Sequence, residues 1–344
     1  MALETIDLTR APWRAEGQLS DVFARRVTYL RVSVTDRCNL RCTYCMPEAG
    51  LPWIPKAEIL SFEEIESIVR AAASVGVTAI RLTGGEPLVR LGLPRLVARL
   101  AAIPGIEDIA LSTNGLLLAE QVRDLAAAGL RRVNVSLDTL RPERFEAIAR
   151  RPGLDRVLAG IDAAIAAGLA PIKLNCVVMR GHNDDELADF AALTRERALF
   201  VRFIEVMPVV ENAAAQRDQY LPSSEILERL RSIGELAPAT GPGGNGPARY
   251  FSFDGAPGAV GVISPLSHDY CETCNRVRLT ADGRLRLCLF GNHEIDLRTP
   301  VRSGATEGDL AALLQSSMLI KPERHHLNLG EAGSRMRAFS EIGG

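Results

Sequence analysis

The chain has 344 residues, of which 47% are hydrophobic and 24% are charged, and its formal net charge at pH 7 is −2. This is the profile of a globular protein with room for one large domain, or for a main domain and a smaller one. The near-neutral balance argues against a protein that binds nucleic acid or a membrane surface through bulk charge. No apolar run approaches the roughly 20 residues that span a bilayer, and residues 1–21 contain no apolar leader, which predicts an unexported, cytoplasmic protein.

Seven cysteines are present, and six of them fall into two groups of three. A chain of this length can build a core large enough to be stable without disulfide bonds. The odd number and the grouping therefore favour metal ligation in a reducing compartment over a disulfide framework. The seventh, Cys176, lies alone in an apolar segment, where a small buried side chain is the simpler interpretation.

A strand followed by a helix recurs from residue 28 onward. Ser61 and Glu64 form a capping box before the first helix, and Asn183 is predicted as the N-cap of the helix after the fifth strand. Strands are predicted at 29–35, 78–83, 106–112, 131–137, 170–179 and 199–207. One strand in about 30 residues matches the βα unit, so we expect a parallel sheet, either curved toward a barrel or flat and doubly wound.

A complete eight-unit barrel takes typically about 250 residues, so six units predict a partial (β/α)6 TIM-type barrel with an open side. The sequence GPGGNGP at 241–247 has the composition of a flexible connector, and short strands and turns follow it. We therefore divide the chain into an N-terminal segment (1–27), the partial barrel (28–238) and a small irregular α+β C-terminal domain (239–344).

Polar residues stand where each predicted strand ends. TGGEP (83–87) follows the second strand and STNG (112–115) follows the third, while later strands carry or end in Ser136, Asp138, Lys173, Asn175, Arg202, Glu205 and Met207. The carboxyl ends of parallel strands converge on one face, and ligands bind there in α/β proteins. Agreement over six consecutive units predicts a ligand site at this face.

The first cysteine triplet, Cys38, Cys42 and Cys45, has the spacing C-x3-C-x2-C on the loop after the first strand. Three thiolates can hold three irons of a 4Fe–4S cluster and leave the fourth iron open, as a reactive site requires. The alternative is a zinc site completed by a remote His or Cys.

The second cysteine triplet, Cys271, Cys274 and Cys288, has the spacing C-x2-C-x13-C. Zinc ribbons normally pair two C-x2-C motifs, and only one is present here. Spacing alone leaves open an iron–sulfur cluster or a zinc site completed by His268 or Cys176.

Cations also recur on the predicted strands, at Arg31, Arg81, Lys173, Arg202, Arg276 and Arg278. Unpaired cations are rare inside proteins, so cations that converge on a cavity indicate an anionic substrate. The alternative is that they face outward and pair with Asp and Glu.

The terminal FSEIGG is either a frayed tail or a docking peptide, and composition favours fraying.

The motifs together are more specific than any one of them. CNLRCTYC after the first strand and TGGEP after the second resemble the radical S-adenosylmethionine (SAM) superfamily. RVSVTDRCNLRCTYCMP, RLTGGEPL, STNG, VSLDTL, KLNCVVMRG, RFIEVMP and SHDYCETCNRVRLTADGRLRLCLF, with the terminal GG, resemble the GTP 3′,8-cyclase family, the molybdenum cofactor biosynthesis A lyases. The resemblance covers nearly the whole chain from residue 20.

This resemblance implies two 4Fe–4S clusters with separate tasks. In the family, the open iron of the first cluster binds SAM, and one-electron reduction yields a 5′-deoxyadenosyl radical. The radical removes hydrogen from C3′ of GTP, and the ribose carbon attacks C8 of guanine. The second cluster binds the guanine end of GTP. The resemblance further implies a one-electron reductant and delivery of the product to cyclic pyranopterin monophosphate synthase. It is also compatible with a homodimer.

The resemblance also assigns site residues by matching motifs. It implies SAM contacts from Tyr44, Gly85, Ser136 and Met207, and GTP contacts from Arg31, Arg81, Thr113, Lys173, Arg276 and Arg278. Arg31, Gly343 and Gly344 are implied in catalysis, because the GlyGly tail of the family reaches into the active site, which reverses the expectation of fraying.

Two departures from the family bear on these assignments. Ala24 stands where many members have Gly, and Ala79 stands where a Lys is frequent. The second departure either removes one expected triphosphate contact or leaves it to a residue elsewhere in the chain.

Two competing hypotheses are another radical SAM enzyme with an auxiliary cluster and a non-catalytic zinc or iron–sulfur module. Electron-transfer clusters normally take four protein ligands each, which six grouped cysteines cannot supply twice.

Overall fold

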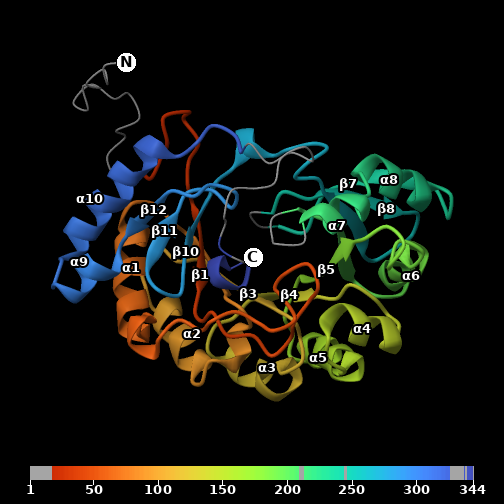
Figure 1. The fold of residues 1–344 in the computed structure, drawn as a ribbon, viewed down its shortest axis with the longest axis horizontal. Helices are drawn as coiled ribbons and strands as arrows, with labels where there is room; N and C mark the ends of the chain where they lie inside the picture. Colours follow the sequence, from red (N-terminus) through yellow and green to blue (C-terminus); the bar gives the residue numbers. More distant parts are fainter. Residues whose placement is uncertain (1–17, 209–212, 244–245, 326–336, 338, 344) are drawn as a thin grey trace.

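The structure is a computed structural model that describes residues 18–208, 213–243, 246–325, 337 and 339–343. Its central element, within this described part, is a curved sheet of twelve strands. Helices lie along the outer side of the curve, and the C-terminal end of the chain lies near the centre of the molecule (Figure 1).

The six strands predicted from the alternating pattern form the middle of the sheet and pair in parallel in chain order. They are β1 (Tyr29–Ser33), β2 (Ala79–Thr83), β3 (Asp108–Thr113), β4 (Arg132–Ser136), β5 (Ile172–Val178) and β6 (Leu199–Glu205). The predicted bounds differ from these by at most two residues. Every residue of β2 is buried, because helices cover one side of the sheet and polar side chains fill the other.

The later strands extend the sheet at both edges. They are β7 (Leu236–Ala239), β8 (Arg249–Phe253), β9 (Ala259–Ile263), β10 (Arg276–Leu279), β11 (Arg284–Arg286) and β12 (Glu294–Asp296). The order is β12-β11-β10-β1-β2-β3-β4-β5-β6-β9-β8-β7, with β10 parallel to β1 and β9 parallel to β6. The sheet is open, as a partial barrel requires, and it runs without a break across residue 239. The division into domains at that residue stays a prediction.

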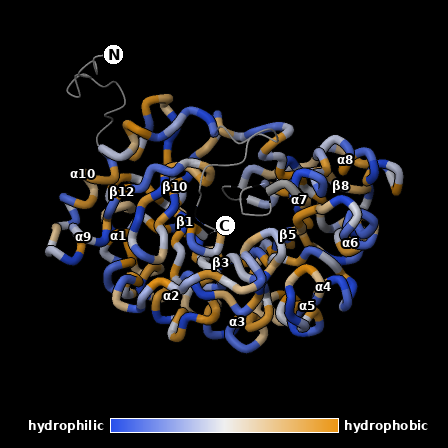
Figure 2. The backbone as a smooth tube through the Cα atoms, viewed as in Figure 1, coloured by the Kyte–Doolittle hydropathy of each residue, from blue (hydrophilic) through white to orange (hydrophobic). Residues whose placement is uncertain are grey.

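The helices alternate with the strands of the barrel. They are η2 (Lys56–Glu58), α1 (Phe62–Ser74), η3 (Pro87–Val89), α2 (Leu93–Ala101), α3 (Leu118–Ala127), α4 (Pro142–Ala149), α5 (Leu154–Ala166), α6 (Leu187–Glu196), α7 (Ala213–Asp218), α8 (Ser223–Arg231), η4 (Cys271–Thr273), α9 (Arg298–Arg302), α10 (Glu307–Ser317), η5 (Met318–Ile320) and α11 (Phe339–Ile342). Orange and blue segments alternate along α2, α3 and α5 in Figure 2, as in amphipathic helices with one buried side.

The capping predictions had opposite outcomes. The Ser61–Glu64 capping box of α1 is confirmed, with both reciprocal hydrogen bonds present. The prediction of Asn183 as a helix cap is wrong, because α6 begins at Leu187 after Glu186. The Asn183 amide instead donates to the carbonyl oxygens of Asp138 and Val177 and accepts from the amide of Met179. A side chain that satisfies three backbone groups elsewhere is not available to cap a helix.

The segment before β1 docks against the barrel. The amide of Leu19 donates to the carbonyl of Val75, and that of Val27 donates to Leu19. Between them Ala24 has φ = 61°, the left-handed region that glycine adopts without penalty. The resemblance places glycine here in many relatives, and this turn explains why.

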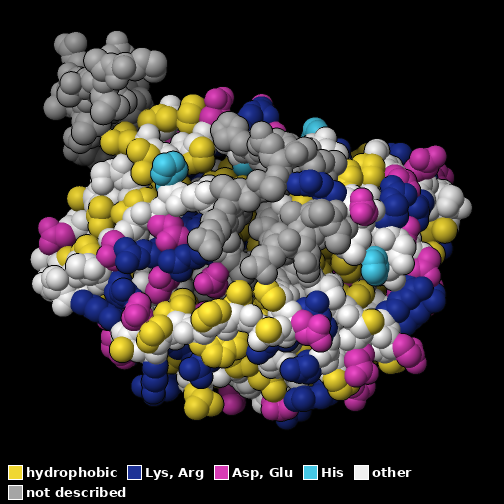
Figure 3. All heavy atoms as spheres, in the orientation of Figure 1, with side chains coloured by type: hydrophobic (Ala, Val, Ile, Leu, Met, Phe, Trp, Pro, Cys, Tyr) yellow, Lys and Arg dark blue, Asp and Glu magenta, His cyan; other side chains and the backbone are white. Residues whose placement is uncertain are grey.

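The outer surface carries both charges. On the face shown in Figure 3, Lys and Arg side chains lie interspersed with Asp and Glu. Among the described residues, the helices are all too short or too polar to cross a membrane.

Candidate active site

A cavity of ≈ 270 Å³, here the main cavity, lies on the inner side of the barrel sheet. Residues from six barrel strands, from the loops that follow them and from the C-terminal segment line it together. It contains twelve of the residues singled out in the sequence, namely Arg31, Cys38, Cys42, Tyr44, Cys45, Arg81, Gly85, Thr113, Ser136, Met207, Arg276 and Arg278. Arg202, one of the cations on the predicted strands, lines it too.

The three cysteines of the first triplet line this cavity. All seven cysteines are free. Burial raises the pKa of Cys38 to about 11, with a further contribution from Glu86. Burial likewise raises the pKa of Cys45 to about 12, with further contributions from Cys38 and Asp138. The Cys38 sulfur accepts hydrogen bonds from the Leu40 amide (3.4 Å) and the Asn114 side chain (3.9 Å). Bonds of this kind to sulfur are typical of cluster ligands, and a bound metal ion keeps such thiols deprotonated.

The TGGEP loop packs directly on the cysteine loop. A Cβ atom on Gly84 or Gly85 would collide with the backbone oxygens of Thr35 or Arg37, so only glycine permits this approach. The Glu86 carboxylate then accepts from the Thr113 hydroxyl (2.7 Å) and the Asn114 amide (2.6 Å). Burial raises the pKa of Glu86 to about 7 despite these bonds. The loops after β2 and β3 are thereby fixed to each other beside the first triplet.

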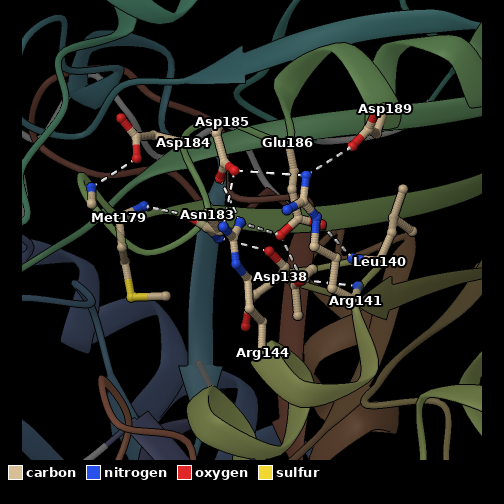
Figure 4. A network of polar contacts seen from close by, with 12 residues as sticks. Asp138, Leu140, Arg141, Arg144, Met179, Asn183, Asp184, Asp185, Glu186 and Asp189 are labelled. Atoms are coloured by element: carbon tan, nitrogen blue, oxygen red, sulfur yellow. Dashed lines mark hydrogen bonds and ion pairs between the residues drawn. The ribbon is translucent and has the colours of Figure 1, made fainter.

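Tyr44 is oriented by a buried carboxylate. Its hydroxyl donates to Asp138 (2.8 Å), which also accepts from the Val177 amide (2.8 Å). Burial raises the pKa of Asp138 to about 6. Figure 4 shows the polar network behind Asp138, in which Glu186 accepts from the Leu140 amide, the Thr139 hydroxyl and Arg144.

Four arginines from three adjacent strands form a cationic wall of the main cavity. In the register of the sheet, Arg31 lies between Arg81 and Arg278, and Arg276 is two residues before Arg278. Burial, followed by the charge of neighbouring arginines, lowers the pKa of Arg278 to about 10 and that of Arg31 well below its usual value. Like charges held together away from water favour an anion between them. The alternative of outward-facing, surface-paired arginines is wrong for Arg81 and Arg278, which are buried in this wall.

The C-terminal segment enters the main cavity. Phe339 and Ser340 line it, and the carbonyl of Gly343 accepts from Arg278 (2.7 Å) and Arg31 (3.2 Å). Gly343 has φ = 69°, and a Cβ atom there would lie 2.5 Å from Cγ2 of Thr83. The fraying favoured by composition is wrong for residues 339–343, since Ser340 and Ile342 are buried. Gly344 lies outside the described residues.

The second triplet lines a small pocket of ≈ 40 Å³ that shares Tyr270, Arg276, Arg278 and Leu289 with the main cavity. Burial raises the pKa of Cys274, but Lys321 and Arg276 outweigh it and the net direction is downward. His268 and Cys176 do not line this pocket; His325 does. Among the described residues, no three or more His, Cys, Asp or Glu side chains are arranged to hold a single metal ion.

Lys173 does not line the main cavity. Its ammonium group donates to the carbonyls of Pro242 and Gly243, at 3.3 Å each, in a neighbouring groove that shares Gly246 with the main cavity. Burial, together with Arg202, lowers the pKa of Lys173 to about 7. Carbonyl groups of the connector thus bind the ammonium group of Lys173, which the resemblance assigns to GTP binding.

Several residues of the site were missed in the sequence, among them Tyr29, Arg25 and Lys321. Tyr29 lines the main cavity and its hydroxyl accepts from Arg81. Period-two alternation would have found it, because it precedes Arg31 by two positions on one strand. Arg25 and Lys321 donate hydrogen bonds to the segments that carry the second triplet. No local sequence pattern indicates this role, because their partners are remote in sequence.

Comparison with known proteins supports one family. A model of the Radical SAM superfamily matches residues 32–194, and a Molybdenum Cofactor Synthesis C model matches residues 199–327. The chain is 54% identical to the GTP 3′,8-cyclase of Heliobacterium modesticaldum (94% of this chain, 99% of that protein). It is 50% identical to that of Pelotomaculum thermopropionicum (95% and 100%).

A solved structure of Streptococcus suis SuiB, bound to S-adenosylmethionine, shares the fold with a TM-score of 0.58 at 13% identity, over 83% of this chain and 68% of that one. Membership of the radical SAM superfamily implies a 4Fe–4S cluster and SAM, and the first triplet has the spacing and surroundings that suit such a cluster. This chain belongs to the GTP 3′,8-cyclase family of radical SAM enzymes.

Proposed function

We propose that this chain converts GTP into 3′,8-cyclo-7,8-dihydro-GTP, an early step of molybdenum cofactor biosynthesis. One observation carries the proposal. The two cysteine triplets open into contiguous cavities, and Arg276 and Arg278 line both. A substrate that is anionic at one end can therefore contact the cationic wall while its other end reaches the second triplet.

The first half of the site is assigned to SAM. Cys38, Cys42 and Cys45 hold the first 4Fe–4S cluster, and Tyr44, Gly85, Ser136 and Met207 contact SAM. The fit is supported by the close packing at Gly84 and Gly85, which leaves the backbone of this loop open toward the cavity. When bound, the cluster and SAM supply a 5′-deoxyadenosyl radical that removes hydrogen from C3′ of GTP before this carbon joins C8.

The second half is assigned to GTP. Cys271, Cys274 and Cys288 hold a second 4Fe–4S cluster, which receives the guanine end. Arg31, Arg81, Thr113, Lys173, Arg276 and Arg278 contact the substrate, with the arginines on the triphosphate. Charge-assisted hydrogen bonds in a buried site support both affinity and orientation. For Lys173 the assignment requires that GTP replaces the two connector carbonyls.

The protein's share of the reaction is to orient the substrate and exclude water. Arg31 and the terminal Gly343 and Gly344 act as catalytic residues, since the Gly343 carbonyl already meets Arg31 and Arg278. The Tyr44–Asp138 hydrogen bond holds the cysteine loop in place. A one-electron reductant, a downstream cyclic pyranopterin monophosphate synthase, a cytoplasmic location and a homodimer complete the proposal.

The test uses the full chain, reconstituted with iron and sulfide without oxygen. We expect about eight irons per chain, four for each cluster, and 5′-deoxyadenosine formation that depends on GTP and yields the cyclised nucleotide. Cleavage of SAM at the same rate without GTP, with no cyclised product, contradicts the activity. Four irons per chain contradict the second cluster alone.

A further inference from the structure

A lysine lies buried against the second triplet. Lys321 follows η5, and only 3% of its surface is exposed. Its ammonium group donates to the carbonyls of Leu287 (2.6 Å) and Arg276 (3.2 Å) and to the sulfur of Cys274 (3.7 Å). The three acceptors belong to the segments that carry Cys274 and Cys288.

The geometry fits a charged amine. Three acceptors use the three N–H bonds of an ammonium group, whereas a neutral amine has two. A buried charge is costly unless an opposite charge compensates it. Among the ion pairs of the described residues, none includes Lys321. Of its three acceptors two are neutral carbonyls, and only the cysteine sulfur can carry a negative charge.

Arg25 holds the Lys321 segment in position. Its guanidinium donates to the carbonyls of Glu323 (2.6 Å), Pro322 (2.7 Å) and Cys271 (2.8 Å). The charge of Arg25 is itself balanced by Asp21, at 2.6 Å. The two buried cations therefore differ, because Arg25 faces a carboxylate and Lys321 faces a sulfur.

We propose that Lys321 supplies a fixed positive charge to the second cluster, which stabilises its reduced state and orients the Cys274 thiolate. The proposal rests on the second 4Fe–4S cluster of the proposed function. Hydrogen bonds to cluster sulfurs and nearby charge tune reduction potentials, and reduction adds a negative charge that a cation at 3.7 Å from the sulfur stabilises. Lys321 is thus a positioning residue that acts through Cys274.

The experiment compares Lys321→Met, Lys321→Gln and Lys321→Arg in the full, reconstituted chain. Redox titration followed by paramagnetic resonance gives the midpoint potential of each cluster. Cys288→Ser, which should retain the first cluster alone, assigns the two signals. Exposed Lys56→Met is the control for loss of a lysine, and the first cluster is a reference within the same molecule.

We expect the second cluster of Lys321→Met and Lys321→Gln to shift to a more negative potential, with the first cluster unchanged and Lys321→Arg close to wild type. An unchanged potential in a neutral variant that keeps both clusters overturns the inference. Should both neutral variants lose the second cluster, its retention in Lys321→Arg supports the charge, and its loss there shows a purely geometric role. Four irons in the wild-type chain would instead reject the second cluster itself.

Discussion

The two cysteine triplets each supply three thiols but differ in their electrostatic surroundings. Near the first triplet, acids add to burial: Glu86 raises the pKa of Cys38, although Arg41 lowers it, and Asp138 raises that of Cys42. Near the second triplet, Lys321 and Arg276 lower the pKa of Cys274 against burial, whereas Asp269 adds to burial in raising that of Cys271. In the proposed function, the acids suit a cationic sulfonium beside the first triplet, and the cations suit an anionic nucleotide beside the second.

The triplets also differ in how the chain builds them. Eight residues of one loop carry the first, so its geometry is local and is braced by the neighbouring TGGEP and STNG loops. The second combines Cys271 and Cys274, around η4, with Cys288 after β11, and Arg25 and Lys321 tie these parts together. The surroundings of the first triplet thus depend on local packing, and those of the second depend on remote contacts.

The largest expected effect tests whether the triplets have separate tasks. Cys288→Ser should lower iron from about eight to about four per chain and abolish the cyclised product, since only the second cluster loses a ligand. Iron analysis and product chromatography measure both. Cys176→Ala is the matched control, because this buried thiol lines neither pocket and both clusters should survive. Normal cyclisation by Cys288→Ser would contradict the division of tasks.

The next effect concerns the segment that joins the two halves. Gly343→Ala should lower turnover by about 10²-fold, because the new Cβ atom collides with Thr83 and displaces a carbonyl that meets Arg31 and Arg278. Iron content should not change. Gly255→Ala is the control: its φ of 67° carries the same backbone strain, but no atom lies within 4 Å of the new Cβ. Equal turnover in both variants would show that the tail is not part of the site.

The cationic wall can be probed by binding alone. Arg278→Ala should weaken the binding of GTP by about 1.5–3 kcal/mol, the contribution of a buried charge-assisted hydrogen bond. The Kd should therefore rise by tens of fold. Equilibrium binding without SAM avoids any effect on turnover. Arg197→Ala removes an arginine that pairs with Asp162 at the surface and should leave Kd unchanged. Identical affinities for the two variants would place the nucleotide elsewhere.

The smallest effect is a pH dependence from Lys173. Its pKa of about 7 means that it is cationic below pH 7 and neutral above it. If GTP contacts this group, affinity should fall by a few-fold between pH 6 and 8 relative to Lys173→Arg, which stays charged. GTP titrates in the same way in both proteins, so the ratio of the two Kd values isolates the lysine. A ratio that does not change with pH would leave Lys173 bonded to the connector in the complex.

The local features of this fold could be predicted from sequence, because they depend on neighbours in the chain. Period-two and period-3.6 patterns gave the six barrel strands, and the rule for parallel sheets brought the first triplet beside TGGEP. The capping box at Ser61 needs only the residue three positions later. In contrast, the cap at Asn183 was wrong because three backbone groups, one of them 45 positions away, compete for its side-chain amide.

Features that join remote segments could not be predicted in this way. Arg25 and Glu323 are 298 positions apart, and nothing near either residue indicates the other. The pairing of β10 with β1 and of β9 with β6 is likewise set by three-dimensional packing. Lys173 shows a further limit: its place on a barrel strand was right, but the strand position does not reveal that the connector covers it.

The way β9 and β10 complete the sheet has a consequence for biosynthesis of the protein itself. Both edges of the barrel, β1 and β6, pair with strands that the ribosome makes only after all six barrel strands, from residues 259–279. Until then two long parallel edges are open to pairing with other chains. We therefore expect a chain truncated before residue 259 to aggregate rather than to form a smaller enzyme. We also expect the nascent full-length chain to need chaperones until β10 has been made.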